Sequence, residues 1–308
     1  MSLIVVPTDA ATVQDAITAA NEGDSIQILA GTFDGFDVTK ERLKIFGCGV
    51  GKTIISGVPG SGNDGVVLNA DQTILERFTV QGFPEIGIRV NSNNNVLNQL
   101  ESNFNGTDGF SFLGFAGGDH NLIIQCNASF NEQDGLATGF QAANNCMIRC
   151  NSFQNKDDGF DISTTNNKFI SNVTKGNSTN GLALSSSGDS MNILFNNSLL
   201  KNGSDGISNP TGPFNNIIEN LVCNNGNSGI FVQNDFSVID SNIIRNNGMS
   251  GTGSGILVSD TFAQNNTIRF NKLKNNTPND IEAPPPANTN NTFDGNKCEN
   301  SLPPGLCT

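Results

Sequence analysis

The sequence contains no tryptophan and no tyrosine, although it contains 21 phenylalanines. Sugar-binding clefts often offer an amphipathic aromatic side chain as a platform, and only phenylalanine is available for that purpose here. The absence therefore counts against a carbohydrate-active role. Phenylalanine stacks usually fill cores, and we expect this of Phe153, Phe160, Phe169, Phe195, Phe231 and Phe270.

Positively charged residues are also scarce. The 308 residues include 16 Lys and Arg against 29 Asp and Glu, which gives a formal net charge of -13. An acidic surface argues against binding to nucleic acid or to an anionic membrane, because nucleic acid needs clustered Lys and Arg. No apolar run approaches about 18 residues, so we expect no membrane span. The sequence shows no signal peptide, and this absence is not taken as a sign of a cytosolic protein.

A turn signature, in which a short polar residue precedes glycine and an apolar residue, recurs about every two dozen residues. Its copies are Asp64-Gly65-Val66, Asp108-Gly109-Phe110, Asp134-Gly135-Leu136, Asp158-Gly159-Phe160, Asn180-Gly181-Leu182, Asp205-Gly206-Ile207, Ser228-Gly229-Ile230 and Ser254-Gly255-Ile256. Counted from Gly87, the steps between glycines are 22, 26, 24, 22, 25, 23 and 26 residues. A period of this size predicts a repeat architecture.

Two columns of asparagine accompany the turn signature. One lies four residues before the glycine, at Asn105, Asn131, Asn155, Asn177, Asn202 and Asn225; the other contains Asn172, Asn197, Asn220, Asn242 and Asn271, with Cys126 and Cys150 in earlier repeats. The stretches between the columns are short and β-prone, without helical periodicity. One repeat therefore describes one rung, that is, one complete turn, of a parallel β-helix.

Rungs of such a helix stack about 4.8 Å apart, so residues at one phase of the repeat lie above one another. We expect the second asparagine column to form an internal hydrogen-bonded ladder. The turn glycines are expected to supply positive φ. Roughly ten to twelve right-handed rungs would be about 50 Å long. The residues expected to point inward are Phe160, Ile162, Ile207, Ile230, Val232, Ile256 and Val258.

The two ends of the repeat region have their own signals. Thr12 to Asp15 is a capping box, which predicts a short amphipathic helix over residues 12–20 that caps the open end of the solenoid. The first strands are expected at Ser25–Leu29 and Leu43–Phe46. We expect one structural domain: a cap with the first strand at residues 1–40, a β-helix at 41–297 and a tail at 298–308.

The opening third of the chain resembles the pectate-lyase-like superfamily. The motifs that carry the resemblance are Thr12-Val13-Gln14-Asp15-Ala16-Ile17, Gly23-Asp24-Ser25-Ile26, Ala30-Gly31-Thr32-Phe33 and Gly47-Cys48-Gly49-Val50-Gly51-Lys52-Thr53-Ile54-Ile55. The resemblance, which continues over nearly the whole chain, implies a right-handed parallel β-helix. It does not imply one activity, because this fold hosts many.

The chain contains seven cysteines, an odd number, so they cannot all pair with one another in disulfides. Cys298 and Cys307 flank Pro303-Pro304-Gly305 and could form a disulfide that staples the tail; such a bond would suit an extracellular or cell-surface protein. Cys126 and Cys150 share a phase of the repeat and are expected to be buried neighbours. They could form a disulfide or a free apolar pair, and we favour the free pair.

Acidic residues concentrate in Lys156-Asp157-Asp158-Gly159-Phe160-Asp161. Asp158 belongs to the turn column, whereas Asp157 and Asp161 are extra. Strand alternation points Asp161 outward, and Asp134 lies one rung earlier than Asp158, so four carboxylates are expected to converge on the outer face. Without a partner they would raise one another's pKa, and Ca²⁺, which takes six to eight oxygens, would relieve this repulsion.

This Asp-Asp-x-x-Asp pattern, with an Asp one rung earlier, resembles the calcium site of polysaccharide lyase family 9. The resemblance implies that Ca²⁺ bridges the enzyme and a uronate, and that a lysine removes the proton α to the carboxylate. Lys201 is the first candidate for this base and Lys175 the second. The alternative is that these carboxylates are solvated turn residues, with or without a structural ion.

Other signatures are missing. The single histidine, His120, is expected to be a loop residue. No Gly-His-Gly occurs, which argues against a polygalacturonase-like hydrolase, and no Asp-Pro-His-Asp occurs, which argues against an alginate-epimerase-like enzyme. Two functional classes remain: a Ca²⁺-dependent pectate-type lyase acting on acidic polysaccharide, and a non-catalytic structural, adhesive or glycan-binding β-helix. The acidic cluster favours the first, and the missing Trp and Tyr favour the second.

Overall fold

The computed structural model describes residues 2–57, 62–112, 117–139, 142–186, 188–259 and 262–308. The chain divides into two compact units, residues 1–155 and residues 156–308. Both units are parallel β-solenoids, and the chain as a whole makes about 12 rungs with little helix. The predicted all-β solenoid is therefore confirmed.

The first unit contributes strands to three parallel sheets. One sheet contains, in spatial order, β1 (Leu3–Val6), β2 (Ser25–Ile28), β5 (Lys44–Gly47), β8 (Ile74–Glu76), β11 (Val96–Asn98), β14 (Leu122–Ile124) and β17 (Cys146–Ile148). Another contains β3 (Gly31–Phe33), β6 (Thr53–Ser56), β9 (Thr79–Gln81), β12 (Glu101–Asn103), β15 (Asn127–Ser129) and β18 (Asn151–Phe153). The third contains β4 (Phe36–Val38), β7 (Val66–Leu68), β10 (Ile88–Val90), β13 (Phe110–Phe112) and β16 (Leu136–Thr138).

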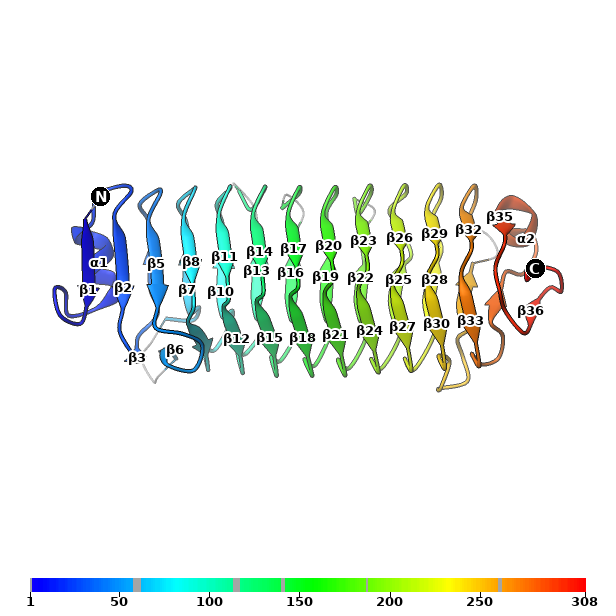
Figure 1. The fold of residues 1–308 in the computed structure, drawn as a ribbon, viewed down its shortest axis with the longest axis horizontal. Coiled ribbons are helices and arrows are strands. Elements are labelled where there is room, and N and C mark those ends of the chain that lie inside the picture. The colour runs from blue at the N-terminus through cyan, green and yellow to red at the C-terminus, as the bar shows by residue number, and fades with distance from the viewer. Residues whose placement is uncertain (1, 58–61, 113–116, 140–141, 187, 260–261) are drawn as a thin grey trace. The chain divides into compact units, whose positions relative to one another are not determined.

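The second unit repeats this arrangement (Figure 1). One sheet contains β20 (Lys168–Ile170), β23 (Ile193–Phe195), β26 (Asn216–Ile218), β29 (Val238–Asp240), β32 (Thr267–Arg269) and β35 (Thr292–Asp294). Another contains β21 (Val173–Lys175), β24 (Ser198–Leu200), β27 (Leu221–Cys223), β30 (Ile243–Arg245) and β33 (Lys272–Lys274). The third contains β19 (Phe160–Ile162), β22 (Leu182–Leu184), β25 (Ile207–Asn209), β28 (Ile230–Val232), β31 (Ile256–Val258), β34 (Ile281–Glu282) and β36 (Ser301–Leu302).

The core follows from the two-residue period of each strand. All seven residues predicted to point inward are buried, and none is more than 2% exposed. The prediction for phenylalanine is partly wrong. Phe160 and Phe169 are buried, but Phe195 is 36% and Phe270 51% exposed. Phe153 and Phe231 are only half-buried, since each lies beside buried neighbours in its strand and alternation turns it outward.

The N-terminal cap forms as predicted. Helix α1 (Val13–Ala19) begins after Thr12, whose hydroxyl accepts a hydrogen bond from the Asp15 amide at 3.0 Å, and its apolar face is buried. The prediction of the first strand is wrong, because β1 precedes α1 and pairs in parallel with β2. In the described part of the chain, no helix is long and apolar enough to cross a membrane.

The C-terminal end contains a short helix α2 (Ala287–Asn290) and the strand β36, which pairs with β34. The predicted disulfide between Cys298 and Cys307 is formed, with a Cα–Cα distance of 5.4 Å. Cys126 and Cys150 are both buried and neither forms a disulfide, which agrees with the favoured alternative. The Cys126 thiol donates to the Leu97 carbonyl and the Cys150 thiol to the Ile123 carbonyl.

The predicted asparagine ladder is present. The Asn220 amide group donates to the Leu194 carbonyl at 2.9 Å, and its Oδ1 accepts from the backbone N–H of Asn197 at 2.8 Å. The structure adds a third column, which the sequence analysis missed: Asn95, Asn121 and Asn145 in the first unit, and Asn167, Asn192, Asn215 and Asn266 in the second. Buried amides therefore link successive rungs at three corners.

Each ladder asparagine follows a residue of positive φ, and this residue is seldom glycine. Examples are His120, Lys201 and Phe214, with φ of 57°, 56° and 63°. The expectation that the turn glycines supply positive φ is wrong. These glycines are needed for close approach instead, because a Cβ on Gly229 would lie 2.5 Å from the Gly255 carbonyl oxygen of the next rung.

Replacing Asn220 by Ala should lower the free energy of unfolding by roughly 1–3 kcal/mol, because buried amide and carbonyl groups of neighbouring rungs lose their partners. The matched control is Asn216→Ala, at a half-buried position on β26 in the same rung. Urea denaturation of both variants measures the difference. Equal stability of the two variants would refute a stabilising ladder.

Replacing Gly229 by Ala should also destabilise the protein, by about 1–3 kcal/mol, because the added methyl group overlaps the next rung. Gly62 provides the control, since a Cβ there would meet nothing closer than 3.8 Å and Gly62 has no positive φ. Thermal melting should show a lower midpoint for Gly229→Ala alone. A normal melting midpoint for that variant would contradict the close-approach explanation.

Candidate functional site

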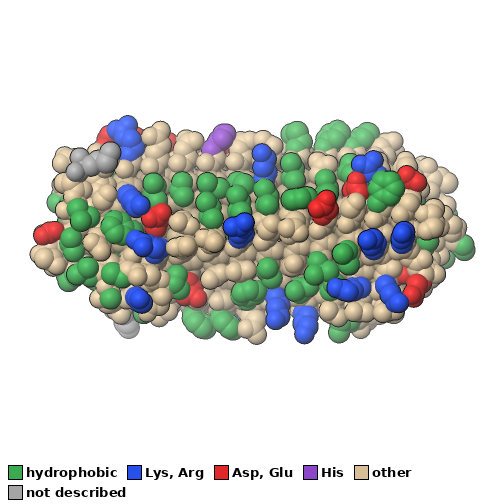
Figure 2. Space-filling model, in the orientation of Figure 1, with side chains coloured by type: hydrophobic (Ala, Val, Ile, Leu, Met, Phe, Trp, Pro, Cys, Tyr) green, Lys and Arg blue, Asp and Glu red, His purple; other side chains and the backbone are tan. Residues whose placement is uncertain are grey.

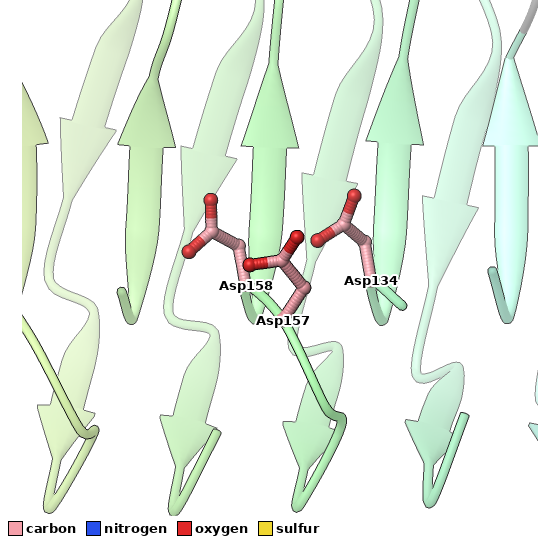
Figure 3. A group of neighbouring side chains, drawn as sticks. All are labelled: Asp134, Asp157 and Asp158. Carbon is pink, nitrogen blue, oxygen red and sulfur yellow. The ribbon is translucent and has the colours of Figure 1, made fainter. Parts of the chain in front are cut away.

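The second unit holds three of the four predicted acidic ligands around the start of β19. Asp157 is exposed, Asp158 is buried, and Asp161 occupies the middle of β19 between the buried Phe160 and Ile162, so that it points outward as predicted. Asp157 and Asp158 are neighbours, with a carboxylate oxygen of each within 4.8 Å of the other (Figure 3). Such an acidic cluster could hold a metal ion.

Hydroxyl groups of the following rung fix these carboxylates. The Thr179 hydroxyl shares its one proton between Oδ1 of Asp157, at 2.7 Å, and Oδ1 of Asp158. The Asn180 amide N–H donates to the same Asp158 oxygen at 2.6 Å. The Ser185 hydroxyl donates to Oδ1 of Asp161. These bonds engage one oxygen of each carboxylate and hold all three side chains in place.

Part of this arrangement is ordinary turn chemistry. The Asp64 carboxylate accepts from the Ile86 amide of the next rung at 3.0 Å, and Asp205 accepts from the Ser228 amide at 2.8 Å. Asp158 does the same toward Asn180. The turn therefore explains Asp158, whereas Asp157 and Asp161 exceed what it needs.

Electrostatics shows that the three carboxylates are crowded. Burial raises the pKa of Asp158 to about 6; hydrogen bonds from Thr179 and Asn180 act against this, and the charges of Asp157 and Asp161 add to it. Burial likewise raises the pKa of Asp161, and the charge of Asp157 adds to that rise. A cation would offset this repulsion. Because every donor is a carboxylate oxygen, the cluster fits a hard ion such as Ca²⁺.

Asp134, the fourth predicted ligand, belongs to the first unit. It precedes β16, and its backbone N–H donates to the Asp108 carboxylate at 3.3 Å, which is the same turn contact as elsewhere in the column. Within its own unit, Asp134 is thus a turn residue. Its assignment to the metal site rests on the phase of the repeat in the sequence.

The two candidate bases lie on neighbouring rungs of the sheet that contains β21 and β24. Lys175 is the last residue of β21 and is exposed; its register partner is Leu200 at the end of β24. Lys201 follows Leu200 directly, at an exposed corner with positive φ, and its backbone N–H donates to the Cys223 carbonyl at 3.0 Å. Both ammonium groups are therefore on the surface.

Several residues of this region did not stand out in the sequence. Thr179 and Ser185 lie 22 and 24 residues after Asp157 and Asp161, so the repeat period could have found them. Asp189 gave no such signal. It is fully buried; its Oδ2 accepts from the Ser186 amide, and its Oδ1 has no hydrogen-bond partner among the described atoms. Burial raises the pKa of Asp189 to about 8, and the charge of Asp161 adds to this.

Residues 64–222, just over half of the chain, match the family described as the right-handed beta helix region. The chain therefore belongs to this family, and the predicted right hand and the pectate-lyase-like fold are confirmed. A search among curated proteins finds no match.

Several solved structures share the fold at low sequence identity. The A-module of mannuronan C-5 epimerase AlgE6 from Azotobacter vinelandii is 16% identical, with a TM-score of 0.73 over 94% of this chain and 85% of that one. The A-module of AlgE4 from the same organism is 18% identical, with a TM-score of 0.71 over 94% and 87%. The Dettilon tailspike protein is 15% identical, with a TM-score of 0.57 over 96% and 66%. These likenesses concern the fold.

The Asp189 carboxyl predicts a pH dependence of stability. Its pKa in the folded protein, about 8, lies above its ordinary value of 3.8, so the folded state binds the proton more tightly than the unfolded state. The contribution of the Asp189 carboxyl to the free energy of unfolding is fully present below about pH 4, and it is lost as the pH rises toward 8. Asp189→Asn should flatten the decline of the melting temperature between pH 4 and 8.

The control for this experiment is Asp294→Asn, which removes an exposed carboxylate from β35. It should leave the slope of melting temperature against pH as in the unchanged protein, because no burial cost is removed. If Asp189→Asn has the same slope as the unchanged protein, the buried carboxyl does not govern this decline.

Proposed function

We propose that the protein acts on an acidic polysaccharide by Ca²⁺-dependent β-elimination. The proposed ligands of the ion are Asp134, Asp157, Asp158 and Asp161. The observation that carries the proposal is the group of three carboxylates in the second unit, two of them beyond the needs of the turn, with a raised pKa at Asp158 and Asp161. Asp134 joins the set on the phase of the repeat alone.

A Ca²⁺ ion held by the cluster would supply positive charge that neutralises a uronate carboxylate and acidifies the adjacent C–H bond. The protein's own groups would do the rest. Thr179 and Ser185 hold the carboxylates in place through their hydroxyl groups, which reduces the reorganisation needed to bind. Lys201 would take the α proton at Nζ, and Lys175 is the second candidate. The electron pair of the C–H bond would form a C=C bond as the glycosidic C–O bond at the β carbon breaks, and solvent would protonate the leaving oxygen.

Two observations support an acidic sugar polymer outside the cytoplasm. Proteins named as mannuronan C-5 epimerases share the fold over 94% of this chain, although the absence of Asp-Pro-His-Asp still argues against epimerisation itself. The disulfide between Cys298 and Cys307 fits an oxidising compartment, so we propose an extracellular or cell-surface location.

The second candidate function is a non-catalytic structural, adhesive or glycan-binding β-helix. The hydrogen bond from the Asn180 amide to Asp158 favours this second candidate, because it gives the carboxylate a structural role in the turn that needs no ligand. The lack of Trp and Tyr also favours it. In this case an ion at the cluster would stabilise the solenoid, and Lys201 would be an ordinary surface residue.

Calorimetry should detect Ca²⁺ binding that disappears in the double variant Asp157→Asn/Asp161→Asn. The matched control is Asp37→Asn/Asp294→Asn, which removes two exposed carboxylates and the same charge. The control should bind as the unchanged protein does. Absence of Ca²⁺ binding by the unchanged protein would eliminate the metal site.

Turnover should appear as rising ultraviolet absorbance from unsaturated uronate products, with polygalacturonate or alginate as substrate, and should stop when a chelator is added. Lys201→Ala should lower kcat by about 100-fold or more while Ca²⁺ binding persists. If Lys175→Ala has that effect instead, Lys175 is the base. Ca²⁺ binding that raises the melting temperature without any turnover would establish the structural alternative.

A further inference from the structure

A cluster of four cations interrupts the acidic surface near the end of the second unit. Arg245 ends β30, Lys272 and Lys274 begin and end β33, and Lys297 forms an isolated parallel bridge with Lys272. All four side chains are exposed, and in β30 and β33 the middle residue is the buried one. We call this set the basic face. Figure 2 shows Lys and Arg side chains gathered in the region where Figure 1 places β30 and β33.

The basic face sets like charges side by side. Arg245 is the register partner of Lys274, and Lys272 is the bridge partner of Lys297. Neighbouring strands are about 4.8 Å apart, so each pair repels across adjacent rungs. Within the described residues, one ion pair reaches the face, between Lys274 and Glu299 at 3.5 Å, and both of its side chains are exposed.

The fold itself does not require these cations. One rung before β30, the first and last positions of the strand hold Leu221 and Cys223. One rung earlier still, the same positions of β24 hold Ser198 and Leu200, in the same parallel register. The sheet therefore accepts apolar and neutral polar residues at these positions. Four cations in a chain of net charge -13 consequently form a local surface of opposite sign, complementary to a polyanion.

We propose that the basic face binds carboxylates of an acidic polysaccharide, with the sugar chain lying across successive rungs of this sheet. The same sheet leads back to the candidate bases: Leu200, which precedes Lys201, registers with Cys223, and Cys223 registers with Arg245. Two rung spacings, about 10 Å, thus separate the strand before Lys201 from that of Arg245. This proposal depends on the proposed function for the choice of an acidic polysaccharide as the ligand. It does not depend on the calcium site.

The test measures binding of oligogalacturonate and oligomannuronate in the presence of a chelator, which removes the contribution of any calcium site. The triple variant Lys272→Gln/Lys274→Gln/Lys297→Gln should bind at least about tenfold more weakly than the unchanged protein. The matched control, Lys52→Gln/Arg149→Gln/Lys168→Gln, removes three exposed cations elsewhere and should bind as the unchanged protein does. Binding should weaken with added salt.

A further variant, Lys272→Arg/Lys274→Arg/Lys297→Arg, keeps the charge and should keep the affinity, which separates loss of charge from loss of folding. Equal weakening in the Gln variant and its control would overturn the proposal, since net charge alone would then account for binding. So would no binding by the unchanged protein, or equally tight binding of a DNA oligonucleotide at the same salt concentration. Failure of the calcium site would appear separately, as absent Ca²⁺ heat in calorimetry.

Discussion

Buried asparagine amides that join one rung to the next are the interaction on which this structure depends. Asn220, for example, accepts from the Asn197 backbone and donates to the Leu194 carbonyl in the preceding rung, and it also donates to Oδ1 of Asn242 in the following rung. The corner needs a residue of positive φ before the asparagine, and several residue types fill that position, among them Lys201 and Phe214. Because the amide provides the hydrogen bonds, the preceding side chain is free to face solvent and to acquire a function.

The fold could be predicted because its two sequence signals, the asparagine columns and the inward-pointing apolar residues, are both periodic. The asparagine column and the inward residues of β28, Ile230 and Val232, follow directly from the period. Errors arose where a side chain left the strand pattern: Phe270 has positive φ at a corner and is exposed despite its size. The role of Gly229 was misjudged because a period records which residue recurs and not whether backbone angle or available space requires it. Strand β1 was missed because it precedes the first repeat.

The candidate site was found in the sequence because it departs from the repeat. Asp157 and Asp161 have no equivalents in neighbouring copies, so they stand out against a column that turn chemistry explains. Their hydroxyl partners, Thr179 and Ser185, do not stand out, since Ser and Thr are common in turns and acquire meaning only through the spatial register. Asp189 lies in the loop between β22 and β23, whose length varies between rungs, so no period could show that it is buried.

The acidic cluster and the basic face both bear on how an acidic chain could bind a polyanion. A polyuronate approaching a chain of net charge -13 is repelled on average, so binding requires local surfaces that reverse this sign. The proposed divalent ion on Asp157 and Asp158 would be one such reversal, and the basic face would be another. The first depends on a metal and acts at one point, whereas the second is permanent and spans two strands and a bridge. A β-helix can hold both because each occupies a position the backbone leaves unconstrained, an outward strand residue or a turn, and neither disturbs the ladders inside.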